Sequence, residues 1–234
     1  WENFNTLVTA DVYRRIALRS ISVALLVTII DALLALPIAI YMAKVLSPRK
    51  RQLLVVLLLL PLWASYLVKA YAWRTLFANG GVLDWLLNPF GLGTPGYGLA
   101  ATTIVLCYLW LPYMILPIYA SAERFDFRLA EAAYDLGAKR MTVVRRIILP
   151  SIRPGVISGI ALVFIPALGS FLQSDMLGGG KTNMVANVIA NNFGQARNWP
   201  FGSALAVLLI VLTLLFVLIM QGAAQRRGDK VELV

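Results

Sequence analysis

The chain has 234 residues, of which 60% are hydrophobic and only 14% charged, and its formal net charge is +10. Soluble domains carry about 45–50% apolar and about 25% charged residues, so this composition argues against a soluble protein. The sequence has no histidine and a single cysteine, Cys107, which excludes disulfide frameworks, Cys/His zinc clusters and His-dependent catalytic triads. We therefore predict no catalytic residue and no metal site, and we expect a membrane protein.

Five long apolar segments divide the chain. A bilayer core about 30 Å thick needs about 20 apolar residues per helix, and each of these segments is close to that length. They run from Ser20 to Val45, Leu53 to Phe77, Leu99 to Ala122, Val156 to Ser174 and Phe201 to Gln221. The sequence therefore predicts an all-α, polytopic transmembrane helix bundle, and we read residues 1–234 as one domain.

The first two segments contain residues of functional interest. Asp31 places an acid within the first span, where a charge is costly and is by default a functional hypothesis; a structural partner on a neighbouring helix is the alternative. In the second span, Trp63, Tyr66 and Trp73 recur at helical spacing. Such a stripe can anchor a helix at the headgroup level. Alternatively, Trp63 and Tyr66 line a pathway and offer ring faces to an ammonium group.

Prolines interrupt the predicted spans at positions 37, 61, 112, 117 and 166. Each removes a backbone donor, which predicts kinks or locally unwound turns. Within lipid, the freed carbonyls must be satisfied by neighbouring helices or by a water-filled path. The pattern favours a packed bundle with a pathway, and ordinary kinking without a role in transport is the alternative.

Residues 123–155, between the third and fourth spans, are basic and have helical character. Glu131 falls in an expected first helical turn. Gly137 readily adopts the left-handed backbone conformation that commonly ends a helix, which we call a left-handed stop. We expect a second helical stretch to begin at Ala138 and to end at Pro150 and Pro154. From pattern alone, this segment suits either an amphipathic helix lying on headgroups or a small-residue surface that enters a cleft on another protein.

The fourth span has two further features. Gly155 and Gly159 form a small-xxx-small step, which predicts close approach of a neighbouring helix. Asp175 lies at the other end of the span. Taken alone, its carboxylate ends a helix at the water boundary, where an acid costs little to solvate.

The distribution of the 21 Lys and Arg residues predicts the orientation. Assigned to the nearest span end, twice as many fall on one side of the membrane as on the other. The richer side contains the Ser47 to Arg51 turn, the 123–155 loop, and the tail with Arg226, Arg227 and Lys230. This side is expected to be cytoplasmic, and the basic residues are therefore assigned to membrane topology, with no nucleic acid as partner.

The 123–155 loop carries a spaced motif. Glu131-Ala132-Ala133, three residues, Gly137, nine residues, and Ile147-x-Leu149-Pro150 fill seven positions across twenty residues. This segment resembles the EAA loop of binding-protein-dependent ABC importer permeases. The resemblance implies that the loop is a coupling helix that docks into a groove of a cytoplasmic ATPase. The coupling residues that it implies are Glu131, Ala132, Ala133, Asp135, Gly137, Ala138, Leu149 and Pro150.

Similarity to this family extends over nearly the whole chain. Pro61-Leu62-Trp63 with Tyr71-Ala72-Trp73, Leu177-Gly178-Gly179, Asn198 to Gly202, and Lys230-Val231-Glu232-Leu233 resemble the B-type subunits of spermidine/putrescine permeases. Family members have six spans, so the resemblance implies one helix before Trp1. It also implies a polyamine cargo, for which Trp63, Tyr66, Asp175 and Asp31 are the candidate path residues.

The same resemblance implies the fold, partners and location. We expect a type I ABC importer permease in the bacterial inner membrane, without a cofactor of its own. The expected partners are a cytoplasmic ABC ATPase dimer that binds ATP and Mg²⁺, a second permease subunit, an extracytoplasmic substrate-binding protein and the lipid bilayer. An ABC importer for another small organic solute is the alternative. A secondary transporter would need ion sites near the midplane, for which Asp31 alone gives little support.

Overall fold

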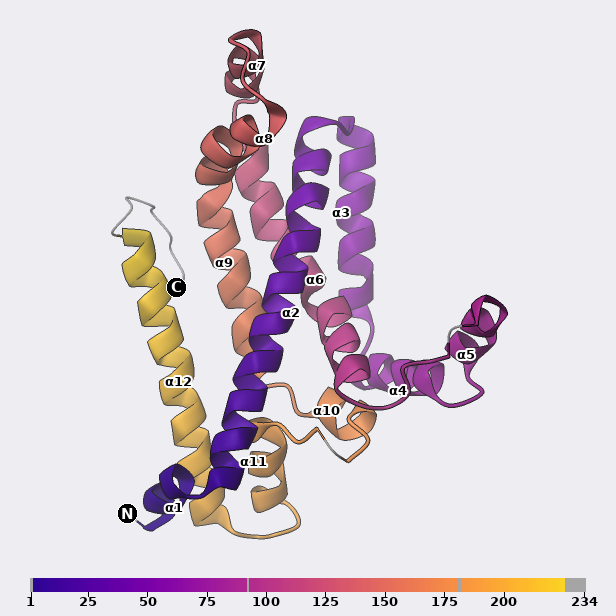
Figure 1. The fold of residues 1–234 in the computed structure, drawn as a ribbon, viewed down its shortest axis with the longest axis vertical. Helices are drawn as coiled ribbons and strands as arrows, with labels where there is room; N and C mark the ends of the chain where they lie inside the picture. The colour runs from indigo at the N-terminus through magenta and orange to yellow at the C-terminus, as the bar shows by residue number, and fades with distance from the viewer. Residues whose placement is uncertain (1, 92, 181, 226–234) are drawn as a thin grey trace. The chain divides into compact units, whose positions relative to one another are not determined.

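The computed structural model describes residues 2–91, 93–180 and 182–225, and in these residues it contains helices and turns without a strand (Figure 1). This confirms the all-α prediction. The helices are α1 (Glu2–Thr9), α2 (Asp11–Lys44), α3 (Pro48–Trp63), α4 (Tyr66–Phe77), α5 (Val82–Leu87), the 3-10 helix η1 (Asn88–Phe90), α6 (Leu99–Glu123), α7 (Arg128–Asp135), α8 (Arg140–Val143), the π-helix η2 (Val144–Ile148), α9 (Leu149–Leu168), α10 (Leu172–Leu177), α11 (Val185–Phe193) and α12 (Trp199–Gln225).

Four helical segments are long and apolar enough to cross a membrane. They are Asp11–Lys44, Leu99–Glu123, Arg140–Leu168 and Trp199–Gly222. A fifth candidate is the bent pair formed by Pro48–Trp63 and Tyr66–Leu76. The described residues therefore contain four or five candidate spans, in agreement with the predicted polytopic bundle.

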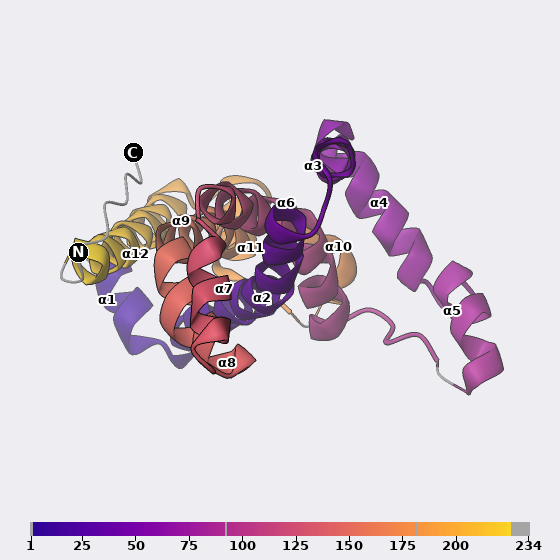
Figure 2. The same cartoon turned by 90° about the horizontal axis from the view of Figure 1, so that it is seen from above.

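The predicted second span, Leu53 to Phe77, is not one continuous helix. It is bent by 90° between α3 and α4. Figure 2 shows α4 followed by α5, which belongs to the same unit. Pro61 lacks the N–H needed for the helical ladder, and the helix ends two residues later. Ser65 is extended, with φ −53° and ψ 136°, and its carbonyl accepts the Lys69 N–H at 3.1 Å as α4 begins. The kink or unwound turn that the sequence predicts near Pro61 is therefore observed.

The helix of the predicted fourth span has different bounds. It ends at Leu168, and the residues up to Ser174 belong to a turn and to the separate helix α10. The prediction that Pro150 and Pro154 end the preceding helix was wrong, because α9 runs through both. Pro150 lies inside the continuous helical segment Arg140–Leu168, directly after its π-helical turn. The π turn before it, closed by Leu149 N–H to the Val144 carbonyl, gives the backbone room to continue.

The chain divides into two compact units, which we describe separately. Unit 1 comprises the described residues of Trp1–Thr28, Leu62–Leu109 and Phe164–Leu215. Unit 2 comprises those of Ile29–Pro61, Trp110–Val163 and Phe216–Val234. The reading of residues 1–234 as one permease domain stays a prediction.

The core of unit 1 joins segments from both ends of the chain. Leu7 packs with residues of α11 and α12, and the cluster is Leu7, Val185, Phe201, Ala204 and Leu205. The backbone N–H of Val185, at the start of α11, donates a 2.8 Å hydrogen bond to Ser20 Oγ of α2. This buried polar contact satisfies one of the unpaired N–H groups at a helix N-terminus.

In unit 2, α6 and α9 approach each other closely at the two glycines of the small-xxx-small step. A Cβ on Gly155 would overlap the Pro117 carbonyl oxygen and the Ser121 side chain, and one on Gly159 would lie 2.7 Å from Met114 Sδ. The predicted close helix approach is therefore confirmed.

Candidate coupling helix and substrate path

Helix α7 contains the first half of the EAA-like motif, and local hydrogen bonds define both of its ends. At its start, Asp126 Oδ1 accepts the Arg128 N–H at 3.0 Å. At its end, Gly137 has a φ of +82°, and the N–H groups of Gly137 and Ala138 bond to the carbonyls of Tyr134 and Ala133 at 2.8 and 3.0 Å. This pair of bonds is the Schellman arrangement, in which glycine is favoured because L-residues avoid positive φ. The predicted left-handed stop is confirmed.

The two faces of α7 differ in exposure. Ala130 is fully buried, whereas Leu129 is 58% and Leu136, just after the helix, is 89% exposed. The EAA-like residues Glu131, Ala132 and Asp135 are also exposed, while Ala133 and Ala138 are half-buried. One face of α7 therefore packs on the rest of unit 2. The other face leaves acidic, small and apolar side chains open to contact with another protein.

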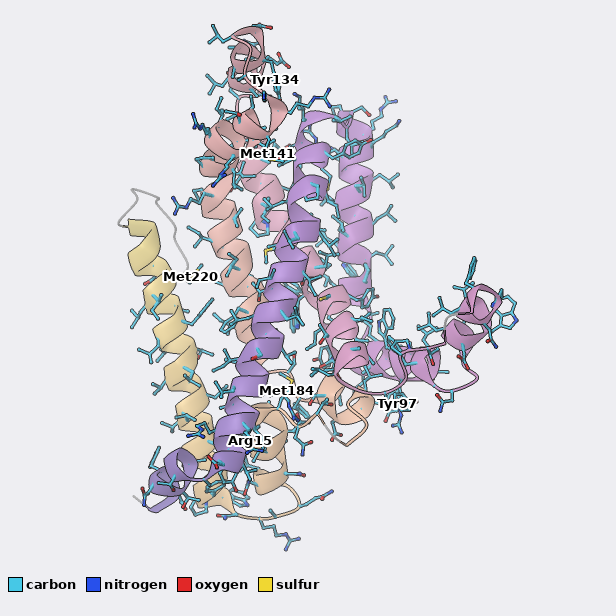
Figure 3. The ribbon with its side chains drawn as sticks, viewed as in Figure 1. Arg15, Tyr97, Tyr134, Met141, Met184 and Met220 are labelled. Carbon is cyan, nitrogen blue, oxygen red and sulfur yellow. The ribbon has the colours of Figure 1, made fainter. Side chains whose placement is uncertain are left out.

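The second half of the motif begins the long helix α9. Leu149 is 37% exposed and Pro150 is exposed, whereas Ile147 is half-buried and Ile148 is buried. Tyr134 on α7 and Met141 on α8, labelled in Figure 3, lie at the same end of unit 2. The structure thus brings both halves of the motif to one end of this unit, with an exposed surface on each.

Arg51 connects this end of unit 2 across three helices. Its Nε and Nη2 donate to the carbonyls of Met42 and Ala43 near the end of α2, at 3.2 and 2.8 Å. Its Nη1 bonds Glu123 Oε1 at 2.9 Å, and the Tyr119 hydroxyl donates to the same carboxylate oxygen at 2.9 Å. The Ser47–Arg51 turn therefore lies beside the start of the coupling loop, as expected if both basic segments face the same side of the membrane.

The candidate path residues Trp63 and Tyr66 flank the break between α3 and α4. Trp63, the last residue of α3, is 90% exposed, and Tyr66, the first of α4, is 38% exposed. The Tyr66 hydroxyl donates a 2.5 Å hydrogen bond to Oε1 of Gln173 on α10. The structure thus connects Tyr66 with the helix that carries Asp175.

The two candidate acids lie in different environments. Asp175 is exposed on the first turn of α10, two residues beyond Gln173. Asp31, in the part of α2 that belongs to unit 2, is fully buried at 0% exposure. Tyr66 and Asp175 therefore share unit 1 with Trp63, and Asp31 belongs to the other unit.

Sequence reasoning missed a buried polar cluster around α10. Gln173 is 0% and Ser174 is 3% exposed. Asn187 of α11 accepts hydrogen bonds from the Ser174 hydroxyl and from the Met184 N–H, and its Nδ2 donates to the Phe171 carbonyl at 3.0 Å. Polar residues at the end of an apolar segment were the available signal, because a buried polar group in a membrane protein needs a partner.

Two further predictions concern metals and the C-terminal tail. Within residues 2–91, 93–180 and 182–225, no group of three His, Cys, Asp or Glu side chains is arranged to hold a metal ion. The basic tail residues Arg226, Arg227 and Lys230, and the Lys230 to Leu233 segment, lie outside the described residues.

Comparison with known proteins identifies the relatives of this chain. Residues 18–229 match the family described as "binding-protein-dependent transport system inner membrane component". The chain is 39% identical to the spermidine/putrescine transport system permease protein PotB of Haemophilus influenzae, over 99% of this chain and 82% of the relative. It is 37% identical to PotB of Escherichia coli over 94% and 82%, and 34% identical to the inner membrane ABC transporter permease protein YdcU of that organism over 86% and 69%.

Solved structures show the same fold at low sequence identity. A bacterial ABC transporter for import of the acidic polysaccharide alginate matches with a TM-score of 0.75 and 19% identity, over 97% of this chain and 83% of the other. The methionine transporter MetNI matches with a TM-score of 0.64 and 16% identity, over 94% and 99%. The architecture is therefore that of type I ABC importer permeases.

The helical spans, the family match and the named relatives agree, and the relatives are named as transport permeases, not enzymes. The chain belongs to the family of binding-protein-dependent transport system inner membrane components, and it is a multi-pass permease subunit of the cytoplasmic membrane.

Proposed function

We propose that this permease subunit imports polyamines such as spermidine and putrescine, driven by ATP hydrolysis in a partner protein. The observation that carries this proposal is the 37–39% identity, over nearly the full chain, to proteins named spermidine/putrescine permeases. An importer for another small organic solute shares the fold but lacks this support, and a secondary transporter lacks the family match.

The coupling role is assigned to α7 and to the start of α9. An exposed surface with Glu131, Ala132, Asp135 and Leu136 suits insertion into a groove of a cytoplasmic ABC ATPase, because small and apolar side chains allow close contact. ATP and Mg²⁺ are bound by that ATPase dimer. The remaining partners are a second permease subunit, an extracytoplasmic binding protein that delivers the solute, and the bilayer.

The cargo path is assigned to the surroundings of the α3–α4 break. A polyamine has several ammonium groups, which bind carboxylates, amide oxygens and aromatic ring faces. The exposed carboxylate of Asp175, the exposed ring of Trp63 and the half-exposed ring of Tyr66 offer such groups in unit 1. Asp31 stays a candidate in unit 2. Several weak contacts suit passage better than one tight site, because the cargo must also leave.

Reconstitution tests this function directly. The subunit is coexpressed with its ATPase, partner permease and binding protein, inserted into liposomes with ATP at the ATPase side, and assayed for uptake of radiolabelled spermidine and putrescine. We expect uptake that requires both ATP and the binding protein. ATP-dependent uptake of only an unrelated organic solute would refute the polyamine assignment. Uptake driven by an ion gradient without ATP would refute the ABC mechanism.

A further inference from the structure

Lys44, the exposed last residue of α2, lies near two aromatic rings that belong to the coupling helix segment. Its Nζ is 5.8 Å from the ring centroid of Phe127 and 5.8 Å from that of Tyr134. A cation within about 6 Å of a ring centroid is attracted by the negative face of the ring. All three residues belong to unit 2, and we call this arrangement the Lys44 clamp.

The two rings lie at opposite ends of α7, so the clamp contacts the helix along its whole length. Phe127 directly precedes the helix and Tyr134 is in its last turn, so the rings are close to two helical turns apart and lie on one side. Both rings are half-buried, and the fully buried Ala130 lies between them. The clamp therefore binds the inner face of α7 and leaves the outer face, with Ala132 and Leu136, free for a partner.

The helix end on which Lys44 lies is itself firmly held. Arg51 bonds the carbonyls of Met42 and Ala43 and bridges to Glu123 at the end of α6. In addition, a cation in the last turn of a helix is stabilised by the partial negative charge of its carbonyls. Arg51 thus fixes the end of α2 to α6, while Lys44 connects the same end to α7.

We propose that Lys44 is a positioning residue that transmits displacement of the coupling helix to α2. The inference rests on the proposed function, in which an ATPase moves α7. A rigid α7 contacted on its outer face moves as a body, and the Lys44 clamp passes that movement to the end of α2, the helix that contains Asp31 and Pro37. Without the cation, α7 moves while α2 receives less of the displacement.

The test uses the assembled complex and five variants, the fifth of which combines Lys44→Met with the loss of both rings. Lys44→Met keeps the length of the side chain and removes its charge, and Lys44→Arg restores a cation that stacks on aromatic rings. Phe127→Leu with Tyr134→Leu removes both rings. Lys50→Met is the matched control, because Lys50 is an exposed lysine in the following turn of chain, at the start of α3.

Two measurements are made on each variant. The first is solute uptake per ATP hydrolysed in liposomes. The second is the distance distribution between spin labels at Arg49→Cys and Arg128→Cys in a Cys107→Ala background, which reports directly on the position of α7 relative to the start of α3. Both labelled positions are exposed.

We expect Lys44→Met to lower uptake per ATP about twofold to fivefold, as suits cation–π contacts of an exposed lysine, and to broaden the label distribution. Lys44→Arg should restore both values, and Lys50→Met should match the wild type. In the background without rings, Lys44→Met should have no further effect. Wild-type values for Lys44→Met in both measurements, or an undiminished effect in the background without rings, would overturn the proposal.

The two measurements separate this inference from the proposed function. If the wild-type complex shows no ATP-driven uptake, the proposed function fails. The Lys44 clamp is then tested by the spin-label distance distribution alone. Broadening by Lys44→Met with recovery by Lys44→Arg then supports the clamp, and an unchanged distribution refutes it.

Discussion

The hydroxyl of Tyr66 donates a 2.5 Å hydrogen bond to the side-chain oxygen of Gln173, which is 107 positions away in the sequence. Gln173 is fully buried, and its Nε2 has no hydrogen-bond partner among the described residues. Rotation of the amide by 180° exchanges its oxygen and nitrogen. The side chain of Gln173 can therefore present either its Nε2 donor or its Oε1 acceptor at the position that has no partner. An ammonium group is itself a donor and requires the oxygen there.

Tyr66→Phe should destabilise the complex more than Gln173→Leu does. Removing the hydroxyl leaves the buried amide oxygen without its partner, at a cost of about 1–3 kcal/mol. In Gln173→Leu, the Tyr66 hydroxyl that loses its partner is on a half-exposed residue, where water can replace the lost bond. The same substitution removes the buried Nε2 that has no partner. Thermal unfolding of the purified complex measures both effects, and the double variant should resemble Gln173→Leu alone. A larger loss from Gln173→Leu would contradict this account.

Asp175→Asn, Trp63→Ala and Tyr66→Ala should each lower polyamine uptake at equal amounts of assembled complex. The first two should not lower the yield of that complex, whereas Tyr66→Ala also removes the hydroxyl that pairs with the buried Gln173. The carboxylate offers an ion pair and the rings offer cation–π contacts of about 2 kcal/mol when desolvated. The assay is initial uptake of labelled spermidine in liposomes. Asp11→Asn is the matched control, because Asp11 is an exposed acid that pairs with Arg14 on its own helix. Wild-type uptake in all three variants would refute this path.

Glu131→Lys and Gly137→Val should leave the subunit inserted but uncouple uptake from ATP hydrolysis. The first reverses a charge on the exposed face of α7. The second forces a β-branched side chain into a φ of +82°, at a cost of about 1–3 kcal/mol. No atom lies within 4 Å of the Cβ position at Gly137, so any loss there reflects backbone strain and not a clash.

The coupling measurement is uptake relative to ATP consumed, with membrane insertion checked in the same preparation. Gly93→Val is the control for Gly137, because its Cβ position is also open and its φ is not in the left-handed region. Normal ATP-driven uptake in both Glu131→Lys and Gly137→Val would exclude a coupling role for α7.

Gly155→Ala should lower the thermal stability of the subunit by about 1–3 kcal/mol, because the added methyl group overlaps backbone and side-chain atoms of α6. Gly169→Ala is the comparison, since the atoms nearest to its Cβ position are 3.8 Å away, at ordinary contact distance. Melting curves of the two purified variants provide the measurement. Equal melting temperatures would mean that α6 and α9 can move apart to accommodate the added methyl group without a loss of stability, which would contradict this prediction.

The charge distribution predicts which chain segments face the cytoplasm. In a Cys107→Ala background, a cysteine near Arg227 should react only with membrane-permeant reagents in intact cells. A cysteine in place of Gly93 should react with impermeant reagents added outside. The labelling pattern on gels gives the answer, and the reverse pattern would overturn the orientation.

The sequence by itself determined the features that depend on local chemistry. The length of the apolar segments indicated a membrane protein, because each must cover the hydrocarbon core. The left-handed stop at Gly137 and the close approach at Gly155 were likewise predictable, because glycine is selected at such positions by backbone geometry and by the absence of a side chain. The motif around Glu131 indicated the family from one loop.

Only the tertiary structure decided how distant residues meet. The exact place and the 90° size of the break at Ser65, the continuation of α9 through Pro150 and Pro154, and the end of α9 at Leu168 depend on which backbone groups find partners after folding. The same holds for Tyr66 with Gln173 and for Arg51 with Glu123, which are 107 and 72 positions apart. Such pairings are not encoded by periodicity, because they arise where packed helices bring polar side chains to the same place.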